Sequence, residues 1–301
     1  MALTSLPVLL YVIPAVMLLA ALVPPRRKIA VLGLGGLICE YVTGGIAGLA
    51  LLMLCICSAW LCIRLMPHEP HQNLPKKKFR LICGIGVQIA ILTAGKMLLS
   101  PAALLPILLC AMLGIECMPA RAAHHLHVPP LLVYLSAACA MPHLWAGPLM
   151  SFPDMREMTE NRSVTAERIG KGASLCMFGL FQLVLLSLPM QTLLSEMDRF
   201  VPLLSAADAW LSLLIFYCAL YYGLKGTVQF GEGLALMLGF CHPESFTNPI
   251  AAVSLSDYWS RCMCSFSAWA KRVLLPNGSS VDSVSYFIRM LLLFSGVVTG
   301  T

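Results

Sequence analysis

Long apolar runs are the feature that most restricts what this chain can fold into. Of its 301 residues, 59% are hydrophobic and only 11% are charged, and the mean hydropathy is +0.83. Soluble globular domains carry about 25% charged residues, whereas a helix that crosses a bilayer needs about 20 consecutive apolar residues. Several runs reach that length, so the sequence predicts an integral membrane protein. The runs lack the strict alternation of membrane β-strands, which predicts helices rather than a barrel.

We therefore expect an all-α, polytopic membrane helical bundle with roughly eight to ten transmembrane or re-entrant helices, forming one domain over residues 1–301. The stretch 29–66 is too long for one crossing at about 1.5 Å per residue, and a break is expected between Glu40 and Gly45. The apolar segments expected on this basis are 6–23, 29–38, 46–66, 79–100, 101–118, 129–152, 173–193, 207–224, 227–240 and 284–298. The alternating charges of 153–172 predict an interfacial amphipathic helix before 173–193.

Charge placement predicts how the chain is oriented. The net charge is +6 and lies mostly in short loops, which favours orientation in a bilayer over binding of nucleic acid. The basic clusters at 26–28 and 76–80 predict two cytoplasmic loops, with residues 40–45 near the opposite face. No basic residue precedes the first apolar run, so we expect a retained span rather than a cleaved signal peptide.

Cysteine and histidine placement predicts neither a bound metal nor a bound cofactor. Most of the 13 cysteines lie inside apolar runs, where cysteine acts as a small hydrophobic residue. No Cys-x-x-Cys pair or Cys/His cluster has zinc-ligand spacing, and we expect no disulfide framework.

A break inside an apolar run marks a second region of interest. Two prolines and a glycine fall within the segment 141–148, which also contains His143 and Trp145. Proline breaks a helix, and broken backbone at membrane depth persists where it is buried in protein or lines a cavity. We expect a kinked or re-entrant segment here, with His143 as a candidate functional group.

The region from Gly233 to Pro276 mixes apolar, aromatic and polar groups most densely, and we expect chemistry there. Four ordered segments within it, GLALMLGF (233–240), PESFTNP (243–249), SLSDYWSR (254–261) and SFSAW (265–269), resemble the signature of the membrane-bound O-acyltransferase family. The most similar branch contains the bacterial alginate O-acetylases and teichoic-acid D-alanyltransferases. Residues 142–149 and 179–181 resemble two further elements of that family.

This resemblance implies a helical bundle with a thinned centre, where an intracellular acyl thioester donor meets an extracellular hydroxyl acceptor. A histidine in the family acts as general base on that hydroxyl. The residues that the resemblance places along the substrate tunnel are His143, Trp145, Asn248, Tyr258, Trp259, Arg261, Ser265 and Trp269.

Departures from the family pattern bear on activity. Met263 and Thr299 stand at the positions of the two family histidines, residues 221–232 lack the acids of the family, and the chain is short at its C-terminal end relative to the family. Neither methionine nor threonine accepts a proton at neutral pH. The groups that could substitute are His242, Asp257 and Cys264, together with Glu232, His143 and Cys262.

Two interpretations remain open, and a third is disfavoured. We favour a catalytically silent relative that acts as a membrane scaffold or assembly subunit, beside an active acyltransferase or a polysaccharide synthase or secretion complex, in the bacterial inner membrane. The alternative is an active O-acyltransferase with a non-standard base or a cysteine acyl carrier. A transporter or channel is disfavoured because the sequence shows no internal repeat and little charge inside its apolar runs.

Overall fold

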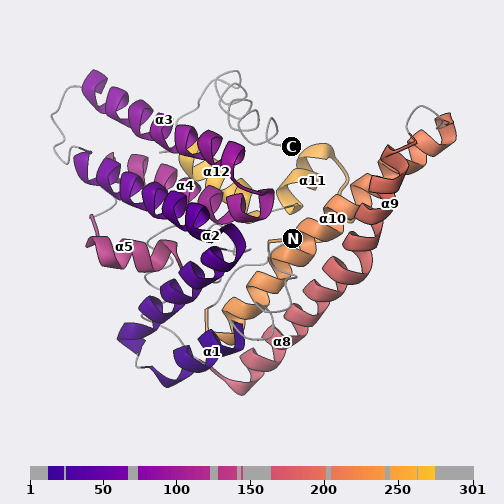
Figure 1. Ribbon diagram of the computed structural model, residues 1–301, viewed down its shortest axis with the longest axis horizontal. Coiled ribbons are helices and arrows are strands. Elements are labelled where there is room, and N and C mark those ends of the chain that lie inside the picture. The colour runs from indigo at the N-terminus through magenta and orange to yellow at the C-terminus, as the bar shows by residue number, and fades with distance from the viewer. Residues whose placement is uncertain are drawn as a thin grey trace.

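The computed structural model describes residues 13–23, 25–66, 74–122, 128–140, 144, 164–200, 205–240, 245–262 and 264–274. The regular elements in these ranges are all helical, which confirms the predicted class (Figure 1). In chain order they are α1 (Ile13–Leu22), α2 (Pro25–Leu65), α3 (Leu74–Leu98), α4 (Pro101–Ala122), α5 (Leu131–Ala138), α8 (Ala166–Phe181), the π-helix η3 (Gln182–Ser187), α9 (Leu188–Asp198), α10 (Ala206–Met237), the 3-10 turn η5 (Pro249–Ala251), α11 (Leu255–Arg261) and α12 (Cys264–Leu274).

Five helical segments of the described chain are long and apolar enough to cross a membrane, which identifies an integral membrane protein. They are Ala30–Leu65, Phe79–Leu98, Ala103–Arg121, Ala166–Asp198 and Ala206–Met237. The expected segment 284–298 and most of 141–152 lie outside the described residues.

The predicted break in the long stretch 29–66 is present at Gly45. This residue has φ 63° and ψ −158°, a backbone conformation outside the α-helix, and α2 forms a V at this point (Figure 1). Glu40 is fully buried near the bend, and neither carboxylate oxygen has a hydrogen-bond partner among the described residues. A Cβ added to Gly44 or Gly48 would lie 2.8 or 2.7 Å from Glu40 Oε1, so these glycines leave room for the carboxyl group.

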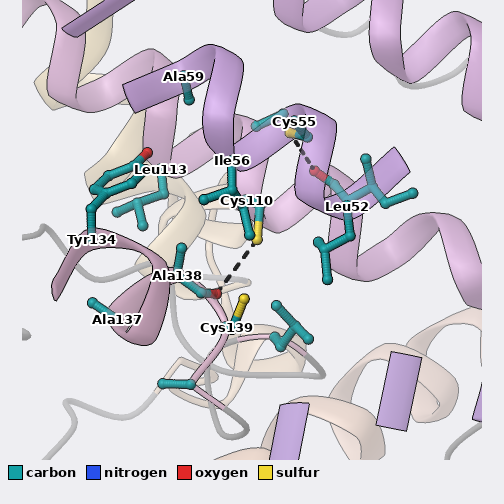
Figure 2. Close-up of a cluster of buried hydrophobic side chains, with 14 of the residues drawn as sticks. Leu52, Cys55, Ile56, Ala59, Cys110, Leu113, Tyr134, Ala137, Ala138 and Cys139 are labelled. Carbon is teal, nitrogen blue, oxygen red and sulfur yellow. Dashed lines mark hydrogen bonds between the residues drawn. The ribbon is translucent and has the colours of Figure 1, made fainter. Parts of the chain in front are cut away.

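The hydrophobic core lies where the second arm of α2 packs on α4 and α5. Figure 2 shows Ile56 and Leu113 from the first two helices beside Tyr134 from the third. The Cys110 thiol donates to the carbonyl of Ala138 at 3.4 Å and links α4 to the end of α5. In the most apolar 18-residue stretch of α4, 72% of the residues are buried, against 33% in that of α2, so α4 is the central helix of this group.

The helices α8, η3 and α9 form a continuous rod that packs beside α10, and the two rods extend away from the core (Figure 1). Glycines let the backbones approach closely. A Cβ added to Gly179 or Gly226 would lie 2.7 Å from the carbonyl oxygen of the other, and Gly172 and Gly233 face each other in the same way at 2.6 Å. Close approach at small residues is the usual means of packing helices in membranes.

The expected division of this hairpin into separate segments was wrong at two places. The segments 207–224 and 227–240 are not separate, because α10 continues through Gly226, which is used for packing on α8 rather than for a turn. The described end of the expected interfacial helix, 166–172, is the first part of α8. Thr165 caps that helix by accepting from the Arg168 amide at 3.2 Å, and the helix continues without a loop.

The amphipathic stretch 255–275 is divided into two helices. Cys262 has an extended backbone, φ −90° and ψ 121°, and ends α11. Beyond it, α12 packs against α4 through Trp269, whose side chain is 1% exposed and whose indole N–H donates to the Met112 carbonyl at 3.0 Å. The elbow between α11 and α12 is therefore fixed to the core at one end.

Candidate functional site

The candidate site is the elbow, defined here as the loop 245–254, α11, Cys262 and the start of α12, together with the part of α10 that faces it. Glu232 of α10 is buried, and its Oε1 accepts from the Ser245 amide at 2.8 Å. The Ser245 carbonyl in turn accepts from the Cys264 amide at 2.8 Å. One carboxylate thus positions the loop, and the loop positions the first turn of α12.

The next residues of the loop turn back on α11. The Thr247 amide donates to the Arg261 carbonyl at 3.1 Å. Asn248 has φ 50°, the left-handed conformation that asparagine tolerates better than most residues, and Pro249 is buried as the first residue of η5. Asn248 therefore contributes to the backbone turn of the loop.

The start of α11 is capped by side chains. Ser254 accepts from the Asp257 amide at 3.1 Å, and Asp257 Oδ2 accepts from the Val253 amide at 3.2 Å. Arg261 Nε donates to Asp257 Oδ1 at 2.7 Å, one helical turn away. The bond from Arg261, with that from the Val253 amide, lowers the pKa of Asp257. The aspartate is thus ionised at neutral pH and already bound to two donors.

Tyrosines form the wall between α10 and α11. The rings of Tyr217 and Tyr221 stack with centroids 6.3 Å apart, and Phe246 meets Tyr221 edge-on at 6.3 Å. The hydroxyls of Tyr217 and Tyr258 are 3.0 Å apart. Burial, with this hydrogen bond, raises the pKa of Tyr258, so its hydroxyl keeps its proton at neutral pH. On the same side of α10, Lys225 Nζ lies 5.6 Å from the Tyr221 ring centre.

The two cysteines of the elbow differ in their surroundings. Cys262 is buried, and burial raises the pKa of its thiol, which disfavours the nucleophilic thiolate. Cys264 is half-buried, and its thiol donates to the Ser260 carbonyl at 3.2 Å and lies 3.6 Å from Thr247 Oγ1. Of the two, Cys264 is the more accessible.

The structure brings only part of the expected site together. Asn248, Asp257, Tyr258, Arg261, Cys264 and Ser265 belong to the elbow, while Trp269 fixes α12 to α4. Trp259 lies in α11, but its side chain is not described. His143, Trp145, His242, Met263 and Thr299 lie outside the described residues. The approach of 142–148 to α11 and α12 consequently stays a prediction.

Sequence reasoning named Glu232 but missed the other residues that α10 contributes to the site. Tyr217, Tyr221, Lys225 and Glu232 follow one another at spacings of four, four and seven residues, so they share one helical face. That periodicity was visible in the sequence once 206–237 is taken as one helix. Within the part of the chain that the structure describes, no group of three or more His, Cys, Asp or Glu side chains could hold a metal ion.

No family model matches the chain. Comparison with known proteins finds relatives named as O-acetylases or O-acetyltransferases. The probable alginate O-acetylase AlgI of Pseudomonas syringae is 31% identical over 170 residues, which cover 54% of this chain and 32% of that protein. Its counterpart in Pseudomonas aeruginosa is 30% identical over the same length, with the same shares covered. The peptidoglycan O-acetyltransferase of Helicobacter pylori is 24% identical over 158 residues, 51% of this chain and 30% of that protein. The chain thus spans about a third of the length of these relatives.

Proposed function

We propose, on the premise that this chain is a relative of the membrane-bound O-acyltransferases, that it takes part in O-acetylation of a polysaccharide or cell-envelope polymer at a bacterial inner membrane. The premise rests on the alginate and peptidoglycan O-acetyltransferases that it resembles over half of its length. The membrane-length helices supply the lipid-embedded bundle that such a reaction needs. The acyl donor in this proposal is a thioester, as in the family.

The elbow is the part of the described chain that fits a hydroxyl-rich acceptor. Tyr217 and Tyr258 offer hydroxyls that both donate and accept, and the Tyr217 ring, which is 43% exposed, offers an aromatic surface beside them. Sugar hydroxyls are bound by groups of this kind, a few polar atoms placed against aromatic and apolar walls. We assign the acceptor polymer to this surface.

A more specific proposal, that the chain does not itself transfer the acyl group, rests on the two acids of the elbow, both of which already accept hydrogen bonds. A general base must lie within hydrogen-bond reach of the group that it deprotonates, about 2.6–3.2 Å between heavy atoms, with a pKa near the working pH. Glu232 accepts from the Ser245 amide, and Asp257 accepts from Arg261 and the Val253 amide. With Met263 and Thr299 at the family's histidine positions, we propose that the chain positions the acceptor and assembles with an active acyltransferase or polysaccharide synthase, without transferring the acyl group itself.

One observation favours the alternative, an active acyltransferase with a non-standard base. Glu232 is a buried carboxylate of α10, and a buried ionisable group facing a candidate site is a candidate for a functional role. His242 stands three residues before Ser245 in the sequence, although it lies outside the described residues. Cys264 is the candidate acyl carrier in this version.

Binding of the acceptor tests the assignment of the elbow. The full chain in nanodiscs should bind a fluorescent acetyl-free oligosaccharide of the acceptor class, and Tyr258→Phe should weaken that binding about fivefold to tenfold, because one net hydrogen bond is worth about 1 kcal/mol. Tyr41→Phe, on the exposed face of α2, is the matched control and should bind like the unmodified chain. Equal affinities for all three chains would overturn the assignment.

A further inference from the structure

One face of α10 changes in character along its length. Trp210, Leu214, Tyr217, Tyr221 and Lys225 follow one another at spacings of three or four residues, which places them on a single face. The opposite face holds the glycines that pack on α8 and η3. The elbow covers this face at Tyr221, which is 7% exposed, whereas Tyr217 is 43%, Leu214 59% and Trp210 73% exposed.

An apolar groove occupies the uncovered half of this face. It has a volume of about 500 Å³ and is lined by Trp210, Leu213, Leu214, Phe216, Tyr217 and Leu220. The groove ends at Tyr217, whose hydroxyl meets that of Tyr258. The apolar groove therefore leads directly to a pair of polar hydroxyls.

The ammonium group of Lys225 lies beyond the end of the groove. Lys225 lies two turns after Tyr217, and its Nζ is 5.6 Å from the Tyr221 ring centre. No carboxylate of the described residues forms an ion pair with it. An ammonium group in a membrane-length helix is costly unless it reaches head groups or an anion, so this position suits a negatively charged ligand.

The dimensions match one leaflet of a bilayer. Charged residues at the tip of the hairpin, among them Asp198, Arg199 and Asp208, indicate one membrane boundary. From Asp208 to Lys225 the helix rises about 25 Å, close to the roughly 30 Å of a hydrocarbon core, so Lys225 lies near the opposite head groups. From Lys225 back to Leu213 is about 18 Å, comparable with the depth of a single leaflet.

We propose that an anionic phospholipid of the bilayer binds this face of α10. Its acyl chain lies along Trp210, Leu214 and Leu220, and its phosphate meets the Lys225 ammonium group. Charge complementarity selects the anionic head group over a zwitterionic one, because Lys225 has no carboxylate partner among the described residues. The bound lipid closes the membrane-facing side of the elbow. This site does not depend on whether the chain transfers an acyl group.

Quenching of Trp210 by brominated lipids tests the site. The full chain is placed in nanodiscs of phosphatidylcholine that contain brominated phosphatidylglycerol or brominated phosphatidylcholine, and the signal of Trp210 is taken as the difference from Trp210→Phe. We expect about fivefold stronger apparent affinity for the brominated phosphatidylglycerol, the effect of one lysine at an anionic surface. Lys225→Gln should remove the preference, while Lys225→Arg keeps it. Lys171→Gln, in the same hairpin but paired with Glu167, is the matched control and should keep it.

Equal quenching by the two head groups in the unmodified chain would overturn the proposal. A preference that survives Lys225→Gln would overturn it as well. Salt gives a second measurement without a variant, since the Debye length falls from about 10 Å at 0.1 M to about 3 Å at 1 M. The preference should fall at high salt if Lys225 causes it, and a preference unchanged by salt contradicts the assignment.

Discussion

The acids of the elbow act on the backbone around them. Glu232 accepts a hydrogen bond from the Ser245 amide, and Asp257 accepts hydrogen bonds from the Val253 amide and the Arg261 side chain. The loop and α11 are short, with few internal hydrogen bonds of their own, so side-chain acceptors decide their conformation. The bonds that Asp257 accepts also lower its pKa, which makes it a weaker base and connects the local geometry to the proposed loss of turnover.

Replacement of Glu232 separates its two possible roles. Glu232→Ala leaves the buried Ser245 amide without its acceptor, at a cost of about 1–3 kcal/mol, whereas Glu232→Gln keeps an amide oxygen in place. We expect the Ala variant to have a lower unfolding temperature in detergent and faster maleimide labelling of Cys264, whose amide depends on Ser245. The Gln variant should stay close to the unmodified chain in both measurements. Equal losses in the two variants would contradict a role in holding the loop.

Asp257 makes the stability of α11 depend on pH. Its pKa in the folded chain is lowered from the ordinary value of 3.8, chiefly by the bond from Arg261. The stabilisation is therefore complete above about pH 4 and is lost as the pH falls through the lowered pKa. Amide hydrogen exchange of α11 should be slow and constant at pH 5–7 once the intrinsic rate is corrected, and should rise below pH 4.

Two substitutions test the same role of Asp257 at neutral pH. Asp257→Asn should raise exchange in α11, because the amide side chain holds Arg261 less strongly than a carboxylate. Asp198→Asn, at the exposed end of α9, should leave α11 unchanged. Exchange in α11 that is indifferent to Asp257→Asn would show that this cap does not hold the helix.

At the level of helices, hydropathy in the sequence predicted the membrane-length segments and the bend in α2, because length and the cluster of glycines mark both. It failed on α10, which was expected as two segments divided around residues 225–226, whereas the helix continues there and Gly226 packs against Gly179. A glycine at a turn and a glycine in a helix seam have the same local signature, and only the position of α8 distinguishes them. The division of 255–275 at Cys262 likewise involves the bond from the Cys264 amide to the distant Ser245 carbonyl, which the sequence does not reveal.

The helix seam can be tested with two substitutions in one hairpin. Gly226→Ala places a Cβ 2.7 Å from the Gly179 carbonyl, a contact with backbone that cannot move cheaply, and we expect about 1–3 kcal/mol of destabilisation. Gly170→Ala, in α8, meets nothing within 4 Å and should be neutral or slightly stabilising. Unfolding in a detergent titration measures both. Two variants of equal stability would mean that α8 and α10 do not pack at this seam.

In the molecule as a whole, two groups of helices frame the elbow. The α2–α4–α5 core fixes α12 through Trp269, and the α8–α10 hairpin holds the loop through Glu232 (Figure 1). The sequence predicted the helical membrane class and its likeness to O-acyltransferases, since both rest on hydropathy and ordered motifs. It could not show which polar groups meet, because Tyr217 and Tyr258 are 41 residues apart and are joined only by the packing of α11 on α10.

Transfer of a labelled acetyl group is the measurement that bears most directly on the proposed role. The full chain in nanodiscs is given an acetyl thioester, with and without acceptor oligosaccharide, and the labelled product is counted. Loss of a general base lowers the rate about 10²–10⁴-fold, so we predict no acceptor-dependent transfer above background, and none for Met263→His alone, because Thr299 is unchanged. Acceptor-dependent transfer by the unmodified chain would contradict the silent role, and its loss in His242→Ala or Cys264→Ala would then identify the group responsible.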